Sequence, residues 1–157
     1  MDKQHLESLG EPVISVGSLS IWVHGYESPA ATDGWDGNWL SVTARCIGKG
    51  ASVIVYGGIL DTVSFLRLHR QLTILQEKRE GTAILKSHEP FLTVKFTAVG
   101  NSGRVDVETD ITPDDVRQRH RFFDSINESD LAAIQTACSY VLKDFPVRKP
   151  ESRGDVD

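Results

Sequence analysis

The stretch LTVKFTAVGNSGRVDVETDI, residues 92–111, decides the fold of this chain. Apolar side chains alternate with polar ones on both sides of Gly100–Gly103, which is the period of a strand with one buried face. Gly100-Asn-Ser-Gly103 has the composition of a tight hairpin turn. We therefore predict two antiparallel strands, Leu92–Val99 and Arg104–Ile111.

The same alternation recurs in both directions from this hairpin. It predicts further strands over Val13–Val16, Leu19–Tyr26, Trp39–Ile47, Ala51–Tyr56 and Thr82–Lys86. Gly17-Ser18 and Gly48-Lys49-Gly50 supply turns between neighbouring strands, and Gly57-Gly58 is expected to end the strand before it. A further strand, charged and at a sheet edge, is predicted over Val116–Phe123.

Two segments change to a period of three and four residues, which is typical of helices with one apolar face. The first is predicted over residues 61–79, with Asp61 as its N-cap and Gly81 after its end. The second is predicted over residues 127–144, with Asn127 as its N-cap and Pro146 after its end.

The order is strands, helix, strands, helix, joined by short loops. This order predicts an α+β fold with a mostly antiparallel sheet of about seven to eight strands and two helices. We expect one domain over residues 12–146, preceded by a polar arm (1–11) and followed by a disordered tail (147–157).

The composition narrows the classes of function. The 157 residues carry a formal net charge of -5, which argues against a nucleic-acid partner. No apolar run is long enough for a membrane helix, and no secretory signal is visible, so the chain is predicted to be cytoplasmic without a membrane role.

The sequence contains no recognisable catalytic or metal-binding motif. The five histidines fall in five separate segments, and Cys46 and Cys138 lie in apolar periodic segments where thiols are usually inert. We therefore predict that the chain is not an enzyme, and we expect neither a metal nor a cofactor.

Polar residues and glycines are densest between Asp33 and Leu40 (DGWDGNWL). The carboxylates suggest a cation-binding loop. The sequence after them, however, lacks the longer series of ligands and the closing glutamate of a calcium-binding loop. We expect a self-bonded structural loop anchored by tryptophan. Its residues of interest are Asp33, Trp35, Asp36, Asn38 and Trp39.

Two other short segments have unusual composition. Glu89-Pro90 interrupts a strand pattern, and Glu89 is read as a solvated turn residue or as a partner of the Asp33–Trp39 loop or of Arg45. Arg117, Arg119, His120 and Arg121 form a basic cluster, which we interpret as charge protecting a sheet edge.

Together these features resemble the WapI-type immunity proteins of bacterial polymorphic toxin systems. The resemblance is carried by Gly25-Tyr26, the loop Asp33–Leu40, a leucine-rich helix, Glu89-Pro90 with its alternating strand, and the helix start Asp130-Leu131. It implies a small cytoplasmic protein that neutralises a cognate toxin by binding it. It also implies that the motif residues support the fold, whereas toxin contacts lie on other exposed surface.

Two alternatives remain open from the residues alone. Trp22, His24 and Tyr26 alternate on one face of a predicted strand, and this face together with Trp35 could line a small-molecule or enzymatic pocket. The same aromatic surface could instead form a homodimer.

Overall fold

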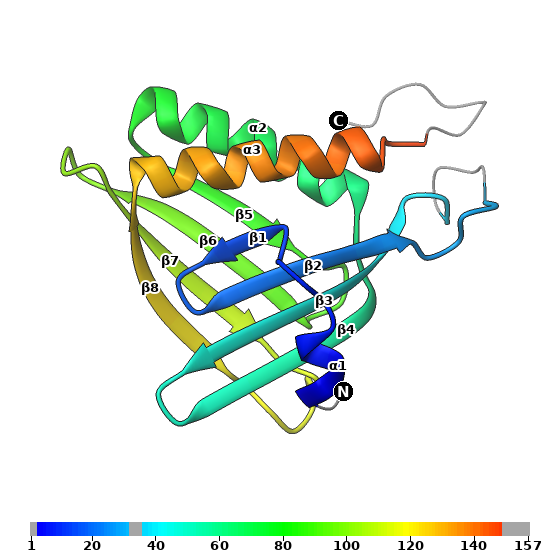
Figure 1. The fold of residues 1–157 in the computed structure, drawn as a ribbon. Helices are drawn as coiled ribbons and strands as arrows, with labels where there is room; N and C mark the ends of the chain where they lie inside the picture. The colour runs from blue at the N-terminus through cyan, green and yellow to red at the C-terminus, as the bar shows by residue number, and fades with distance from the viewer. Residues whose placement is uncertain (1–2, 32–35, 149–157) are drawn as a thin grey trace.

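The computed structural model describes residues 3–31 and 36–148. Its described residues form eight strands in two four-stranded antiparallel sheets, together with two long helices and one short one. Figure 1 shows the two long helices side by side at one end of the sheets, with one sheet crossing in front of the other. The predicted α+β fold and antiparallel strands are confirmed.

Sheet A contains the first four strands in chain order. They are β1 (Ile14–Val16), β2 (Leu19–Tyr26), β3 (Trp39–Gly48) and β4 (Ala51–Asp61). Gly17 has a φ of 55° in the β1–β2 turn, a conformation that glycine adopts without steric cost. Irregularities in the ladder interrupt β2 between Val23 and Gly25, and β3 between Leu40 and Val42.

Sheet B contains the last four strands, again in chain order. They are β5 (Thr82–Lys86), β6 (Leu92–Val99), β7 (Arg104–Ile111) and β8 (Arg121–Asn127). The predicted central hairpin is present, with Leu92 opposite Ile111 and Val99 opposite Arg104.

The helices α2 (Thr62–Lys78) and α3 (Glu128–Asp144) begin at the predicted caps. Asp61 accepts a hydrogen bond from the backbone N–H of Ser64, and Asn127 and Asp130 form a reciprocal capping box. The helices contact each other, while α2 also contacts β5 and α3 contacts β1. A short helix, α1 (Lys3–Glu7), lies within the predicted N-terminal arm.

One continuous core joins the inner faces of both sheets to the apolar faces of α2 and α3. Its largest fully buried side chains include Phe65, Leu68 and Leu72 of α2 and Phe96 of β6. The sheets are also linked directly, because Asp124 of β8 accepts hydrogen bonds from the backbone N–H (3.1 Å) and hydroxyl (2.7 Å) of Ser18.

Two strand boundaries were predicted wrongly. Residues 112–120 form a loop, and β8 begins only at Arg121. The Asp114 carboxylate accepts hydrogen bonds from the backbone N–H groups of Val116 and Arg117, which competes with strand pairing. At the other boundary, β4 continues past Gly57 and ends at Asp61, because an irregular ladder accommodates the φ of 125° at Gly57.

Candidate functional site

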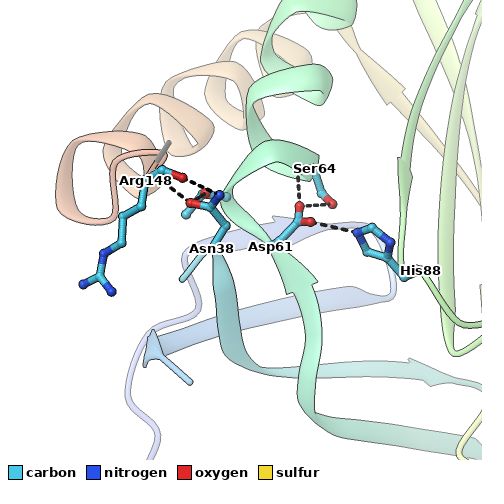
Figure 2. A network of polar contacts seen from close by, with 6 residues as sticks. Asn38, Asp61, Ser64, His88 and Arg148 are labelled. Carbon is cyan, nitrogen blue, oxygen red and sulfur yellow. Dashed lines mark hydrogen bonds and ion pairs between the residues drawn. The ribbon is translucent and has the colours of Figure 1, made fainter. Parts of the chain in front are cut away.

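A polar network joins the start of β3, the start of α2, the β5–β6 turn and the chain after α3. Figure 2 shows Asn38, Asp61, Ser64, His88 and Arg148 in this network. These residues are far apart in the sequence, so the network depends on the tertiary fold. Asp33 and Trp35 of the predicted loop lie outside the described residues, and Asp36 is exposed.

Asn38 is the centre of one half of the network, and its side chain is buried. Its amide Nδ2 donates to the carbonyl of Arg148 at 2.8 Å, and its Oδ1 accepts from the backbone N–H of Arg148 at 2.7 Å. The hydroxyl of Thr62 also donates to Oδ1, at 3.1 Å. Asn38 therefore pairs with one residue of the chain after α3 as a neighbouring strand would.

The Arg148 side chain extends this contact to the loop after β2. Its guanidinium lies 3.6 Å from the centre of the Tyr26 ring, a cation–π geometry. Its Nη1 donates to the carbonyl oxygens of Ala31 at 2.8 Å and Pro29 at 3.1 Å. The Tyr26 hydroxyl donates to the carbonyl of Pro146 at 2.6 Å, so the two segments are held together from both sides.

Asp61 is the centre of the other half. Its Oδ1 accepts from the backbone N–H and the hydroxyl of Ser64, both at 2.7 Å, and its Oδ2 lies 2.8 Å from Nε2 of His88. The His88 ring packs against Trp39 with 4.8 Å between ring centres. Asp61 thus caps α2 and attaches the β5–β6 turn to it.

The network contains a serine, an aspartate and a histidine, but in an order that does not suit nucleophilic catalysis. Activation of a serine requires the imidazole beside the hydroxyl and the carboxylate behind the imidazole. Here Asp61 lies between Ser64 and His88 and binds both. The Ser64 hydroxyl donates its proton to a carboxylate that caps a helix, so the arrangement supports structure.

The two thiols are also unsuited to nucleophilic chemistry. Burial raises the pKa of Cys46 to about 12, an effect that the Ser18 hydroxyl opposes and the Asp124 carboxylate reinforces. Burial likewise raises the pKa of Cys138 to about 12. A thiol must ionise to attack an electrophile, and these thiols stay protonated near neutral pH. Within residues 3–31 and 36–148, no cluster of three or more His, Cys, Asp or Glu side chains could hold a metal ion.

Glu89 and Pro90 occupy the β5–β6 turn, where both are exposed. The Glu89 carbonyl accepts hydrogen bonds from the Ser87 hydroxyl and from the backbone N–H of Phe91. The residue that joins the turn to Asp61 and Trp39 is the preceding His88, which sequence reasoning did not select. A lone histidine before Glu-Pro gives no local signal of a partner 27 residues earlier.

The structure divides Trp22, His24 and Tyr26 between two faces of sheet A. Trp22 lies opposite Thr43, whereas after the bulge Tyr26 lies opposite Leu40, whose side chain is on the core face. Trp22 is buried and donates to the carbonyl of Gly10, while Tyr26 packs edge-on against Phe145. An extra residue in the strand reverses the alternation that the sequence suggested.

A surface cleft lies elsewhere, at the end of sheet B beneath loop 112–120. It encloses about 610 Å³, and its lining includes Pro90, Asp110, Asp115, Arg119 and Arg121. Arg121 is held by Asp110 at 2.6 Å and Glu108 at 3.2 Å, and these carboxylates raise the pKa of Arg121. The cleft wall is therefore a salt-bridged strand pair.

The sequence matches a known protein family. The model of the immunity protein WapI-like family matches residues 14–146, which contain both sheets and both long helices. The chain belongs to this family. The family match covers both halves of the polar network except for Arg148, which follows its end.

Curated proteins and solved structures were compared with the chain as well. No curated protein matches the chain. The fold is similar to WHY1 and WHY3 from Arabidopsis thaliana, each at 11% identity, with TM-scores of 0.47 and 0.45. The match covers 84% of this chain in both cases, and 87% and 85% of the respective chains. The plant transcriptional regulator PBF-2 aligns at 7% identity over 81% of this chain and 75% of its own, with a TM-score of 0.46.

No helix among the described residues is long and apolar enough to cross a membrane.

Proposed function

We propose that this chain is a non-catalytic immunity protein that binds a cognate toxin domain and neutralises it in the cytoplasm. Membership of the WapI-like immunity family, over residues 14–146, is the observation that carries this proposal. The geometry supports it, because the side chains closest in composition to a catalytic set are used in helix capping and chain pairing.

The polar network fits such a role as a structural support. A binding protein gains affinity when its surface is ordered before the partner arrives, since less conformational entropy is then lost on association. The Asn38 and Arg148 contacts hold the chain after α3 against the loop after β2, and Asp61 holds the β5–β6 turn. We infer that this network orders surface loops and does not itself contact a substrate or the toxin.

The test is to produce the chain with the toxin domain encoded by the neighbouring reading frame. We expect the two to form a stable complex of defined stoichiometry in light scattering, and the chain to restore growth of cells that express the toxin. An unrelated toxin domain is the control, and it should be neither bound nor neutralised. Failure of the chain to bind or protect against its neighbour's toxin would overturn the proposal.

The same light-scattering experiment addresses a homodimer. A mass twice that of the chain, in the absence of partner, would favour self-association. The pocket alternative loses support from the separation of Trp22 and Tyr26 onto different faces of β2.

A further inference from the structure

The outer face of the β3–β4 hairpin is a partly exposed surface, here called the hairpin face, in which Thr43 is buried. Leu40, Val42, Ala44 and Cys46 point into the core, so the alternate residues of β3 point outward. The ladder places Thr43 opposite Tyr56, Arg45 opposite Ile54 and Ile47 opposite Ser52. These six residues, with Lys49 in the turn, define the hairpin face.

The hairpin face carries apolar side chains in water. Tyr56 is 62% exposed and Ile47 is 49% exposed, while Ile54 between them is partly buried. Neighbouring positions across two antiparallel strands are close enough for their side chains to form one continuous patch. A patch of large exposed apolar side chains is typical of a protein-binding site.

Its charge is opposite to that of the rest of the chain. Residues 39–60 contain Arg45 and Lys49 but neither aspartate nor glutamate. The whole chain has 17 basic and 22 acidic residues, so the remainder has 15 and 22, a net charge of -7 against +2 here. Among the described residues, neither Arg45 nor Lys49 has a carboxylate partner in any ion pair found.

Arg45 is positioned on the face by an aromatic ring. Its guanidinium carbon lies 5.3 Å from the centre of the Trp22 ring. Its Nε is buried and, in the part of the chain that the structure describes, has no hydrogen-bond partner. A cation held in place but without an anionic partner is suited to a carboxylate supplied by another molecule.

The rival surface is loop 112–120, with the cleft beneath it. Val116 at its tip is 86% exposed, but Asp114 and Asp115 balance Arg117 and Arg119 within the loop. On neighbouring β7, Asp110 pairs with Arg121. The four loop charges sum to zero, whereas residues 39–60 around the hairpin face carry a net charge of +2.

We propose that the hairpin face is the docking surface for the protein partner, and that the partner presents acidic side chains next to apolar ones. This inference rests on the proposed immunity function. The apolar residues Ile47 and Tyr56 provide burial, and Arg45 and Lys49 provide charge complementarity.

The test measures binding of the neighbouring frame's toxin domain to the full chain and to two sets of surface variants. The first set is Ile47→Ser, Tyr56→Ser and Lys49→Glu on the hairpin face. The second is the matched set Val116→Ser and Arg117→Glu on the loop. Thermal unfolding checks that each variant is folded, and binding is measured at low and high salt.

We expect Tyr56→Ser and Ile47→Ser each to weaken binding at least about tenfold, as truncation at the centre of an interface does. Lys49→Glu should slow association and reduce its salt dependence. The loop variants should bind within about twofold of the original chain.

Two other results separate this inference from the proposed function. In the first, the original chain binds the toxin domain, but the loop variants weaken binding, or both sets weaken it equally. This result would overturn the hairpin face as the docking surface but keep the immunity function. An original chain that does not bind the toxin domain at all would overturn both.

Discussion

At the scale of single residues, Asn38 shows how one side chain can replace a strand partner. Its amide has a donor and an acceptor spaced like those of a peptide group, and both bind the backbone of Arg148. Because Asn38 is buried, removal of its amide leaves polar groups without partners. Such groups cost more free energy than the hydrogen bonds themselves contribute.

Replacement of Asn38 by alanine is therefore expected to lower the free energy of unfolding by about 2–3 kcal/mol. Arg148→Ala should cost less, about 1 kcal/mol, because it removes only the contacts with Tyr26 and the 28–31 carbonyls and keeps the backbone pairing. Urea denaturation of both variants measures the difference. Equal losses would show that the guanidinium, and not the Asn38 amide, holds the segment.

The buried thiols make a second prediction at this scale. The pKa of Cys46 and Cys138 is about 12 in the folded chain, against an ordinary value of 9.0. Above pH 9 the unfolded chain therefore loses thiol protons that the folded chain keeps. This stabilising effect is fully present below pH 9 and is lost as the pH rises towards 12.

We expect the unfolding free energy to fall by up to about 1.4 kcal/mol per pH unit per thiol in this window. The double variant Cys46→Ala/Cys138→Ala is the control for other groups that ionise there, and its stability should fall less steeply between pH 9 and 11. Parallel curves for the two proteins would mean that the thiols ionise equally in both states.

At the scale of elements, the start of α2 has two structural tasks. Asp61 caps the helix through one oxygen and contacts His88 through the other. The cap is visible in the sequence because it involves residues three positions apart, and the prediction of Asp61 and Asn127 as N-caps is confirmed. The contact with His88 spans 27 positions and has no such signal.

The two tasks can be separated by substitution. Asp61→Ala should destabilise the chain by about 1–2 kcal/mol, because it removes the cap and the contact with His88. Asp61→Asn keeps an acceptor for the Ser64 N–H and should cost less than half as much. Chemical denaturation provides the measurement. If both variants lose the same amount, the carboxylate charge near His88 matters more than the cap.

At the scale of the whole molecule, the two sheets are joined where the β1–β2 turn meets β8. Ser18 donates twice to Asp124, and Gly17 approaches the same carboxylate closely. A Cβ added at Gly17 would lie 2.2 Å from the carboxylate carbon of Asp124. The packing of the sheets thus requires glycine at this position as well as a turn.

Gly17→Ala is expected to destabilise the chain by about 2–3 kcal/mol, through its φ of 55° and the displaced carboxylate. Gly50→Ala is the matched control, since Gly50 has a φ of 74° with nothing within 4 Å of an added Cβ. It should cost only about 1 kcal/mol. In an Asp124→Ala background, the loss of unfolding free energy caused by Gly17→Ala should fall to that of the Gly50→Ala control. A loss that stays larger would mean that the added methyl group clashes with a residue other than Asp124.

The sequence by itself determined the central hairpin, both long helices with their caps, and the α+β class. These features depend on backbone geometry within a few residues, so alternation, helical spacing and capping side chains record them locally. The order of residues also indicated the family, and the family match over residues 14–146 agrees with that resemblance.

Only the tertiary structure decided the rest. In the part of the chain that the structure describes, the division of eight strands into two sheets depends on distant segments. The same holds for the bulge that separates Trp22 from Tyr26 and for the attachment of His88 to Asp61. It also holds for the attachment of Arg148 to Asn38, 110 positions apart. The energy of such contacts depends on which surfaces the folded chain brings together, and one side chain's identity does not specify its distant partner.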